Sequence, residues 1–239
     1  MTTALETRLL ETLAAKSLLN HPFYRAWTAG TLPVERLQEY ARQYYHFEAA
    51  FPRLLSAIHT RTENPATRQL ILENLWDEEY GTRNHVALWL EFAEATGVSR
   101  GEVVTSTQRP ETAALVDHME TVCREAPIAE ALASLFAYEG QVPAVAKEKI
   151  RGLRDLYAFT PEQYEFFTVH ESADMAHSGA ELEAIARESG ATNDEAIVAA
   201  ADAACDRLLA FLDGCYAPSE LMNSVSGAEA FANGTGVSG

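Results

Sequence analysis

Apolar residues recur at the spacing of α-helices along almost the whole chain. Leu5, Leu9 and Leu13 lie one helical turn apart, and further on Tyr40 and Tyr44 continue the same spacing on a second amphipathic stretch. Prolines, asparagines and glycines mark the expected helix ends. The pattern predicts about seven or eight helices, at residues 3–19, 22–30, 32–61, 65–97, 110–123, 128–153, 161–189 and 194–216.

The amino-acid composition supports an all-α fold. Ala, Leu and Glu are abundant, whereas alternating runs of Val, Ile and Thr are nearly missing. Short connections between the helices favour a compact bundle, and we expect one domain over residues 1–217. Residues 218–239 are rich in Gly, Ser, Ala and Asn with little to bury, so we expect a disordered tail there.

Net charge and hydropathy exclude several classes of partner. The 35 acidic and 18 basic residues give a formal charge of -17, which repels nucleic acid and anionic membranes. The sequence has no apolar run of membrane-spanning length and no signal-peptide pattern, so we expect a soluble, cytoplasmic protein without a membrane or nucleic-acid partner. Cys123, Cys205 and Cys215 form no CxxC pair, which predicts buried free thiols.

Two histidines and a carboxylate fall on one face of the predicted helix 161–189. At about 100° per residue, His170, Asp174 and His177 lie within roughly 60° of one another. The two histidine backbones are about 10 Å apart, which is too far for easy chelation of one ion but suits a pair of ions. This face therefore predicts a dinuclear metal site.

Two other predicted helices offer further ligands. Glu78 and His85 lie seven residues apart on one stripe of the helix 65–97, and Glu139 stands in a mostly apolar segment where a carboxylate needs a reason. Each of these side chains taken alone fits a structural or surface role. Together, these histidines and carboxylates lie on helix faces that are otherwise apolar, which favours metal binding. The mixture of imidazoles and carboxylates suits iron or manganese.

Several of these segments together resemble a known group of enzymes, the CADD group of haem-oxygenase-like dimetal oxidases in the TenA/PqqC superfamily. The resemblance covers about residues 18–186. The matching segments are His21-Pro22-Phe23-Tyr24, the run from Tyr40 to Phe51, Leu75-Trp76-Asp77-Glu78-Glu79 with His85, Tyr138-Glu139-Gly140-Gln141-Val142-Pro143 through Lys147-Glu148-Lys149-Ile150, and His170-x3-Asp174-x2-His177.

The resemblance implies a haem-oxygenase-like bundle of about seven helices and a specific site. The implied ligands of two metal ions, Fe/Fe or Mn/Fe, are Glu78, His85, Glu139, His170, Asp174 and His177. Enzymes of this group make 4-aminobenzoate for folate synthesis with dioxygen as co-substrate and an external reductant. They consume one of their own tyrosines, which matches Tyr24, and the implied amine donor matches Lys149. Tyr40 and Tyr138 match further tyrosines near that site. A homodimer is left open.

Two other functions stay open at this point. A related dimetal oxidase could act on a diffusible fatty acid or amino acid, with the tyrosines only lining the pocket. A non-catalytic interaction module is the alternative from a different class. Thiaminase-like TenA proteins use a cysteine nucleophile near the segment 131–140, and this chain has no cysteine there, so thiamin hydrolysis has no evident nucleophile.

Overall fold

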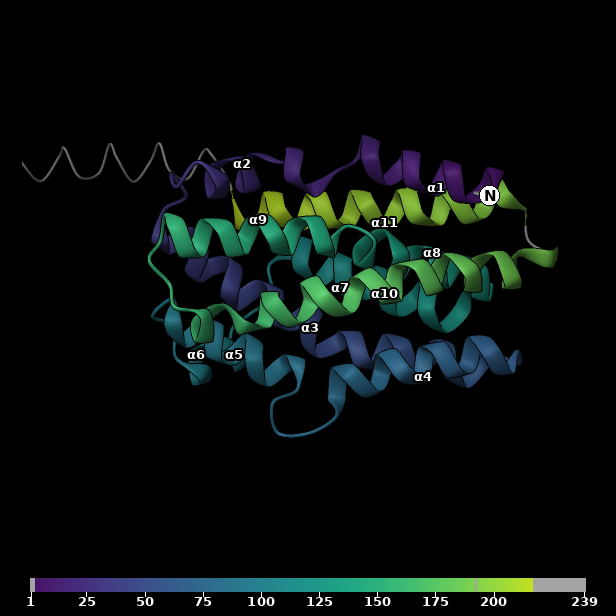
Figure 1. Ribbon diagram of the computed structural model, residues 1–239, viewed down its shortest axis with the longest axis horizontal. Helices are drawn as coiled ribbons and strands as arrows, with labels where there is room; N and C mark the ends of the chain where they lie inside the picture. The colour runs from purple at the N-terminus through teal and green to yellow at the C-terminus, as the bar shows by residue number, and fades with distance from the viewer. Residues whose placement is uncertain (1–2, 192, 217–239) are drawn as a thin grey trace, which may run out of the picture.

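The computed structural model describes residues 3–191 and 193–216, and for residues 172–177 and 191 it describes the backbone alone. Every regular element in this part of the chain is helical, which confirms the all-α prediction (Figure 1). The eleven α-helices there are α1 (Ala4–Ala15), α2 (Pro22–Thr28), α3 (Val34–Arg61), α4 (Pro65–Glu79), α5 (His85–Ala95), α6 (Arg100–Val104), α7 (Pro110–Glu125), α8 (Ile128–Glu139), α9 (Val142–Asp155), α10 (Glu165–Glu188) and α11 (Asp194–Cys215).

Most of the long helices run side by side along the long axis of the molecule (Figure 1). Helix α8 lies inside the bundle, against α7, α10 and α11, and almost all of its side chains are buried. Helix α3 packs against α4, α5 and α7, while α9 packs against α2 and α10. This arrangement places α3, α8 and α10 around a shared interior, where large aromatic side chains form much of the core.

The predicted helix starts at asparagines are confirmed by side-chain caps. Asn64 accepts hydrogen bonds from the backbone N–H groups of Ala66 and Thr67, and Pro65 occupies the first turn of α4. Asn193 caps α11 in the same way through the N–H of Glu195. These caps satisfy backbone donors that would otherwise have no partner at the start of each helix.

The predicted continuous helix over 65–97 is wrong, because the chain breaks between Glu79 and His85 into α4 and α5. Gly81 has φ +86°, a left-handed conformation that ends a helix at little cost only in glycine. Asn84 then caps α5 by accepting from the N–H of Ala87. The break turns the chain, so Glu78 and His85 do not share a helical stripe but face each other from two helices.

The predicted helix over 128–153 also divides, into α8 and α9, at Gly140. A side chain at Gly140 would stand 2.8 Å from the carbonyl oxygen of Phe136, so only glycine fits this close turn. Pro143 follows in the first turn of α9, where its missing N–H is not needed. Lys149 therefore does not continue the helix of Glu139. These two breaks and the short α6 explain why there are more helices than the pattern indicated.

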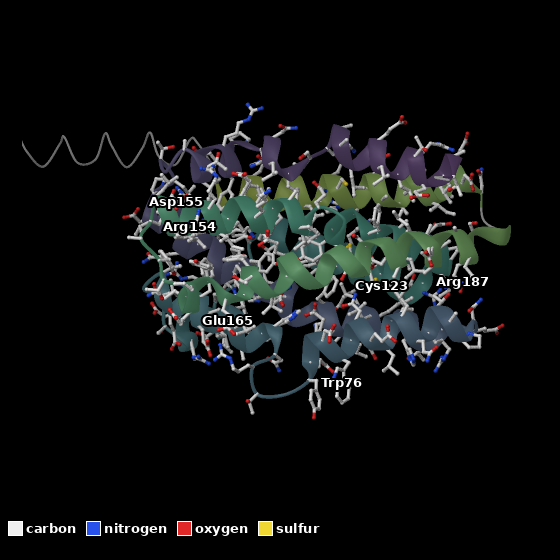
Figure 2. All side chains as sticks on the ribbon, in the orientation of Figure 1. Trp76, Cys123, Arg154, Asp155, Glu165 and Arg187 are labelled. Carbon is white, nitrogen blue, oxygen red and sulfur yellow. The ribbon has the colours of Figure 1, made fainter. Side chains whose placement is uncertain are left out.

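The surface and termini bear on three other expectations. None of the helices in the described residues is long and apolar enough to cross a membrane. The three cysteines are buried and free, as expected. Trp76 projects outward from α4 and stacks on Tyr80, with ring centroids 3.8 Å apart (Figure 2). The expected disordered tail at 218–239 lies outside the described residues.

Candidate functional site

Glu78 and His85 meet across the break between α4 and α5. Oε2 of Glu78 lies 2.8 Å from Nδ1 of His85, and both side chains are buried. Despite this approach, Nδ1 of His85 makes no hydrogen bond to any group in the described part of the chain. A carboxylate oxygen and an imidazole nitrogen that face each other in this way are arranged as two ligands of one ion would be.

His170 approaches the same point from α10. Its Nδ1 donates a hydrogen bond to the carbonyl oxygen of Phe166 at 2.8 Å, which leaves Nε2 as the nitrogen that can bind a metal ion. The His170 ring lies against the His85 ring, with centroids 4.2 Å apart. The backbone of α10 thus fixes both the tautomer and the orientation of this imidazole.

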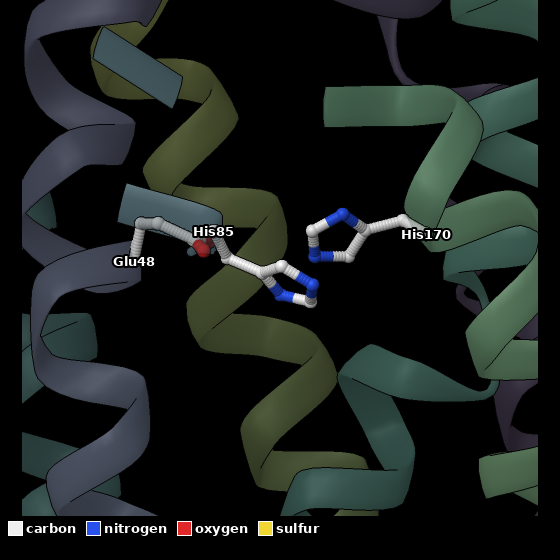
Figure 3. Close-up of side chains that lie close together, drawn as sticks. All are labelled: Glu48, His85 and His170. Atoms are coloured by element: carbon white, nitrogen blue, oxygen red, sulfur yellow. The ribbon is translucent and has the colours of Figure 1, made fainter. Parts of the chain in front are cut away.

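Glu48 on α3 joins His85 and His170 at this point, and the sequence prediction did not include it. Glu48, His85 and His170 each offer one ligand atom, and these atoms all lie within 4.8 Å of one another. Figure 3 shows these three side chains close together. Glu48 comes from α3, His85 from α5 and His170 from α10. The three side chains are buried and form a group able to hold a metal ion.

Glu139, at the end of α8, is held by a side chain of α4. Nδ2 of Asn74 donates to Oε1 of Glu139 at 2.8 Å, and among the described side chains Oε2 of Glu139 has no hydrogen-bond partner. Asn74 precedes Glu78 by four residues, so the two lie on the same face of α4. A buried carboxylate with one oriented oxygen and one unsatisfied oxygen fits a role as a metal ligand.

The remaining predicted ligands, Asp174 and His177, have side chains outside the described residues. The backbone of α10 is helical through both positions. Their placement on the face of His170 therefore stays a prediction. The donor set that is described, of imidazoles and buried carboxylates, matches the chemistry of iron and manganese rather than that of a thiolate-bound metal.

A cavity of about 40 Å³ adjoins the histidine cluster, with His170 in its wall. An engineered cavity of roughly 150 Å³ in another protein holds one benzene molecule, so this cavity suits only a molecule of a few atoms. The polar side chains in the wall, besides His170, are Tyr24, Tyr40, Tyr44, Tyr138 and Lys149.

Lys149 is the only lysine in the cavity wall and is buried among aromatic rings. Its Nζ donates to the Tyr40 hydroxyl at 2.6 Å and lies 5.5 Å from the centroid of the Tyr24 ring. Burial lowers the pKa of Lys149 to about 7, although the charge of Glu48 acts in the opposite direction. A substantial fraction of this amine is therefore neutral near pH 7, with its lone pair available.

The tyrosines of the cavity form two hydrogen-bonded pairs. The Tyr24 hydroxyl lies 3.4 Å from the Tyr40 hydroxyl, and the hydroxyls of Tyr44 and Tyr138 bond to each other. Burial raises the pKa of Tyr24, Tyr40 and Tyr44 above the ordinary value for a phenol. All three rings are thus neutral phenols at neutral pH.

Comparison with known families accounts for this combination of ligands. A family model described as an iron-containing redox enzyme of the haem oxygenase type matches residues 38–211. The chain belongs to this family of iron-containing redox enzymes. The matched segment runs from α3 to α11 and so includes every histidine and carboxylate of the cluster.

Relatives are similar to this chain over most of its length, and solved structures share its fold. It is 42% identical over 215 residues to a 4-aminobenzoate synthase of Nitrosomonas europaea, covering 85% of this chain and 87% of the relative. It is 41% identical over 205 residues to a 4-aminobenzoate synthase of Chlamydia muridarum, covering 85% and 86%. A Shewanella denitrificans domain with a heme oxygenase-like fold superimposes with a TM-score of 0.77 at 17% identity, covering 92% of this chain and 94% of that domain.

The sequence prediction located most of the described site of this redox enzyme. The structure brings Glu78, His85 and His170 together, and it gathers the predicted Tyr24, Tyr40, Tyr138 and Lys149 around one cavity. It adds Glu48 and Asn74, which the prediction missed. A signal for Glu48 was present, because this carboxylate continues the apolar stripe of Tyr40 and Tyr44 at a spacing of four residues.

Proposed function

We propose that this chain is an oxygen-dependent dimetal oxidase that makes 4-aminobenzoate from its own Tyr24, with Lys149 as the source of the amine nitrogen. The observation that carries the proposal is that Tyr24, Lys149 and His170 line one cavity. The relatives named 4-aminobenzoate synthase support the identity of the product. Tyr24 would supply the aromatic ring.

Six residues on α4, α5, α8 and α10 would hold the two metal ions. We assign these positions to Glu78, His85, Glu139, His170, Asp174 and His177. When bound, two iron ions, or one manganese and one iron ion, would supply the reduction of dioxygen with electrons from an external reductant. The unsatisfied oxygen of Glu139 and the facing atoms of Glu78 and His85 fit this assignment.

Lys149 and the tyrosines hold the protons that such a reaction requires. The Lys149 amine, with a pKa of about 7, can lose its proton without a strong base and then present a lone pair toward Tyr24. The Tyr40 hydroxyl accepts from Lys149 and lies beside the Tyr24 hydroxyl, so it connects the two groups. The surrounding aromatic rings exclude bulk water from the cavity.

The size of the cavity favours the protein's own side chain over a bulky diffusible substrate. A cavity of about 40 Å³ suits a small molecule such as dioxygen but is too small for a fatty acid. A substrate that is already part of the wall needs no such space. The size of the cavity therefore supports the proposal over an oxidase that acts on a diffusible fatty acid.

The decisive experiment measures the product and the protein together. Protein loaded anaerobically with iron and manganese is exposed to dioxygen and a reductant, and 4-aminobenzoate is quantified alongside the intact protein mass. We expect up to about one product per chain, loss of mass at Tyr24, and no product from Tyr24→Phe. Tyr45→Phe is the matched control, since Tyr45 is on α3 but outside the cavity wall. Undiminished product from Tyr24→Phe would overturn the use of Tyr24.

The origin of the nitrogen is tested by isotope labelling. Protein grown with ¹⁵N-lysine should release ¹⁵N-labelled 4-aminobenzoate, and Lys149→Arg should abolish it. Lys147→Arg serves as the control, because Lys147 is exposed on the same helix two residues earlier. Unlabelled product from labelled protein would contradict the role of Lys149.

A further inference from the structure

We infer that Glu48 is an additional metal ligand, supplied by α3 and lying outside the six-ligand set. The inference rests on the proposed metal centre and extends it to α3, a helix that carries none of the six assigned ligands. Glu48 is 2% exposed, and its ligand atom lies within 4.8 Å of those of both His85 and His170. Ligand atoms bound to one ion at 2.0–2.2 Å lie at most about 4.4 Å apart, so the three atoms are close to the spacing that one ion requires.

The position of Glu48 on α3 is fixed by its neighbours along the helix. Tyr40, Tyr44 and Glu48 follow one another at intervals of four residues and share one buried face. Tyr40 and Tyr44 line the cavity, and Glu48 stands one turn further, at the two imidazoles. The same helix face thus runs from the cavity wall to the histidine cluster.

The chemistry of a buried carboxylate supports the same conclusion. An ionised carboxylate inside a protein is costly unless a cation balances it. The two imidazoles that cluster with Glu48 are groups that bind metal ions as neutral ligands, and a metal ion between them would stabilise the charge of the Glu48 carboxylate. A carboxylate oxygen is also a preferred ligand of iron and manganese.

The alternative role for Glu48 is that of a counter-ion to Lys149. The charge of Glu48 acts to raise the pKa of Lys149, so the two groups sense each other. The Lys149 ammonium donates a hydrogen bond to the Tyr40 hydroxyl, whereas the Glu48 ligand atom clusters with the histidines. The geometry therefore favours the metal, and the experiment below separates the two roles.

The first test compares metal binding in matched variants. Anaerobic titration with Mn²⁺, with bound metal counted by elemental analysis, should show that Glu48→Gln weakens the binding of one ion at least about tenfold. Glu48→His, which keeps a ligand atom but removes the charge, should recover part of the affinity. Glu39→Gln is the control, because it makes the same change on the same helix at a partly exposed ion pair, and it should leave the Mn²⁺ affinity unchanged. Equal affinities of the wild type and Glu48→Gln would overturn the inference, and equal losses in Glu48→Gln and Glu48→His would assign Glu48 to charge balance alone.

The second test needs no variant and so does not depend on how a variant folds. A crystal structure of the wild-type chain loaded with Mn²⁺, with the ions located by anomalous scattering, should place a Glu48 oxygen within about 2.2 Å of an ion. Bound ions with Glu48 beyond bonding distance would overturn the inference while leaving the proposed function standing. A wild-type chain that binds no Mn²⁺ or Fe²⁺ would instead overturn the proposed metal centre itself.

Discussion

The buried amine of Lys149 should make the stability of the metal-free protein depend on pH in a way that one substitution removes. The pKa of Lys149 falls from 10.5, the value for an unperturbed lysine, to about 7 in the folded state. Between these two values the unfolded chain binds a proton that the folded chain does not, so folding stability decreases as the pH falls from about 10.5 to 7. Below pH 7 both states carry the proton, and this contribution no longer changes.

The magnitude follows from the size of the pKa change. Each pH unit within the window is worth about 1.4 kcal/mol, and the full change of about 3.5 units corresponds to roughly 5 kcal/mol. Lys149→Met keeps a long apolar side chain and removes the titrating group. Relative to this variant, the free energy of unfolding of the wild type should therefore increase by about 3 kcal/mol as the pH rises from 7.5 to 9.5.

Guanidinium chloride unfolding, followed by circular dichroism at pH 7.5, 8.5 and 9.5, measures this difference. Other groups titrate in the same range, but they cancel when the wild type is compared with the variant at each pH. Lys147→Met is the matched control, because Lys147 is exposed on the same helix, and its difference from the wild type should stay constant. A constant difference for Lys149→Met as well would refute the burial argument.

Three further substitutions test local features of the fold. Asn74→Ala removes the donor to Glu139, and unfolding of the metal-free protein should show a loss of about 1–3 kcal/mol. Gly152→Ala would place a methyl group 2.6 Å from the ring of Trp27, and this overpacking should cost about 1–3 kcal/mol and lower the thermal midpoint. In Gly81→Ala the new methyl group meets no atom within 4 Å, yet the φ of +86° should lower the free energy of unfolding by about 1–2 kcal/mol. Gly81→Asn should lower it less, because asparagine tolerates this conformation.

The sequence was sufficient for the fold class and for most helix positions because those depend on local signals. Apolar spacing and capping asparagines such as Asn64 and Asn193 act within a few residues. The break at Gly140 was missed because it depends on contact with other residues. At Gly81 the sequence indicated only a glycine that locally weakens the predicted helix, and the break there depends on a left-handed backbone conformation. A glycine inside an apolar pattern is compatible with both a continuous helix and a turn, so spacing alone does not separate them.

The site was predicted from residue types rather than from correct geometry. Glu78 and His85 were placed on one helical stripe, whereas they meet because the chain turns between them. Glu48 was missed although it continues the apolar stripe of Tyr40 and Tyr44, because its neighbours His85 and His170 come from distant segments. Contacts of this kind arise from how helices pack, which no local pattern encodes.

Helix α3 connects the two ends of the site through a single rigid face. Tyr40 lies at the cavity end beside Lys149, and Glu48 lies at the histidine cluster, eight residues or about 12 Å further along the helix axis. Because α3 is a continuous packed helix, it holds the tyrosines of the cavity wall and the Glu48 carboxylate at a fixed spacing from each other. The proposed substrate site and the proposed metal centre are therefore positioned by one element, so the amine of Lys149, through Tyr40, stands in a fixed relation to the histidine cluster.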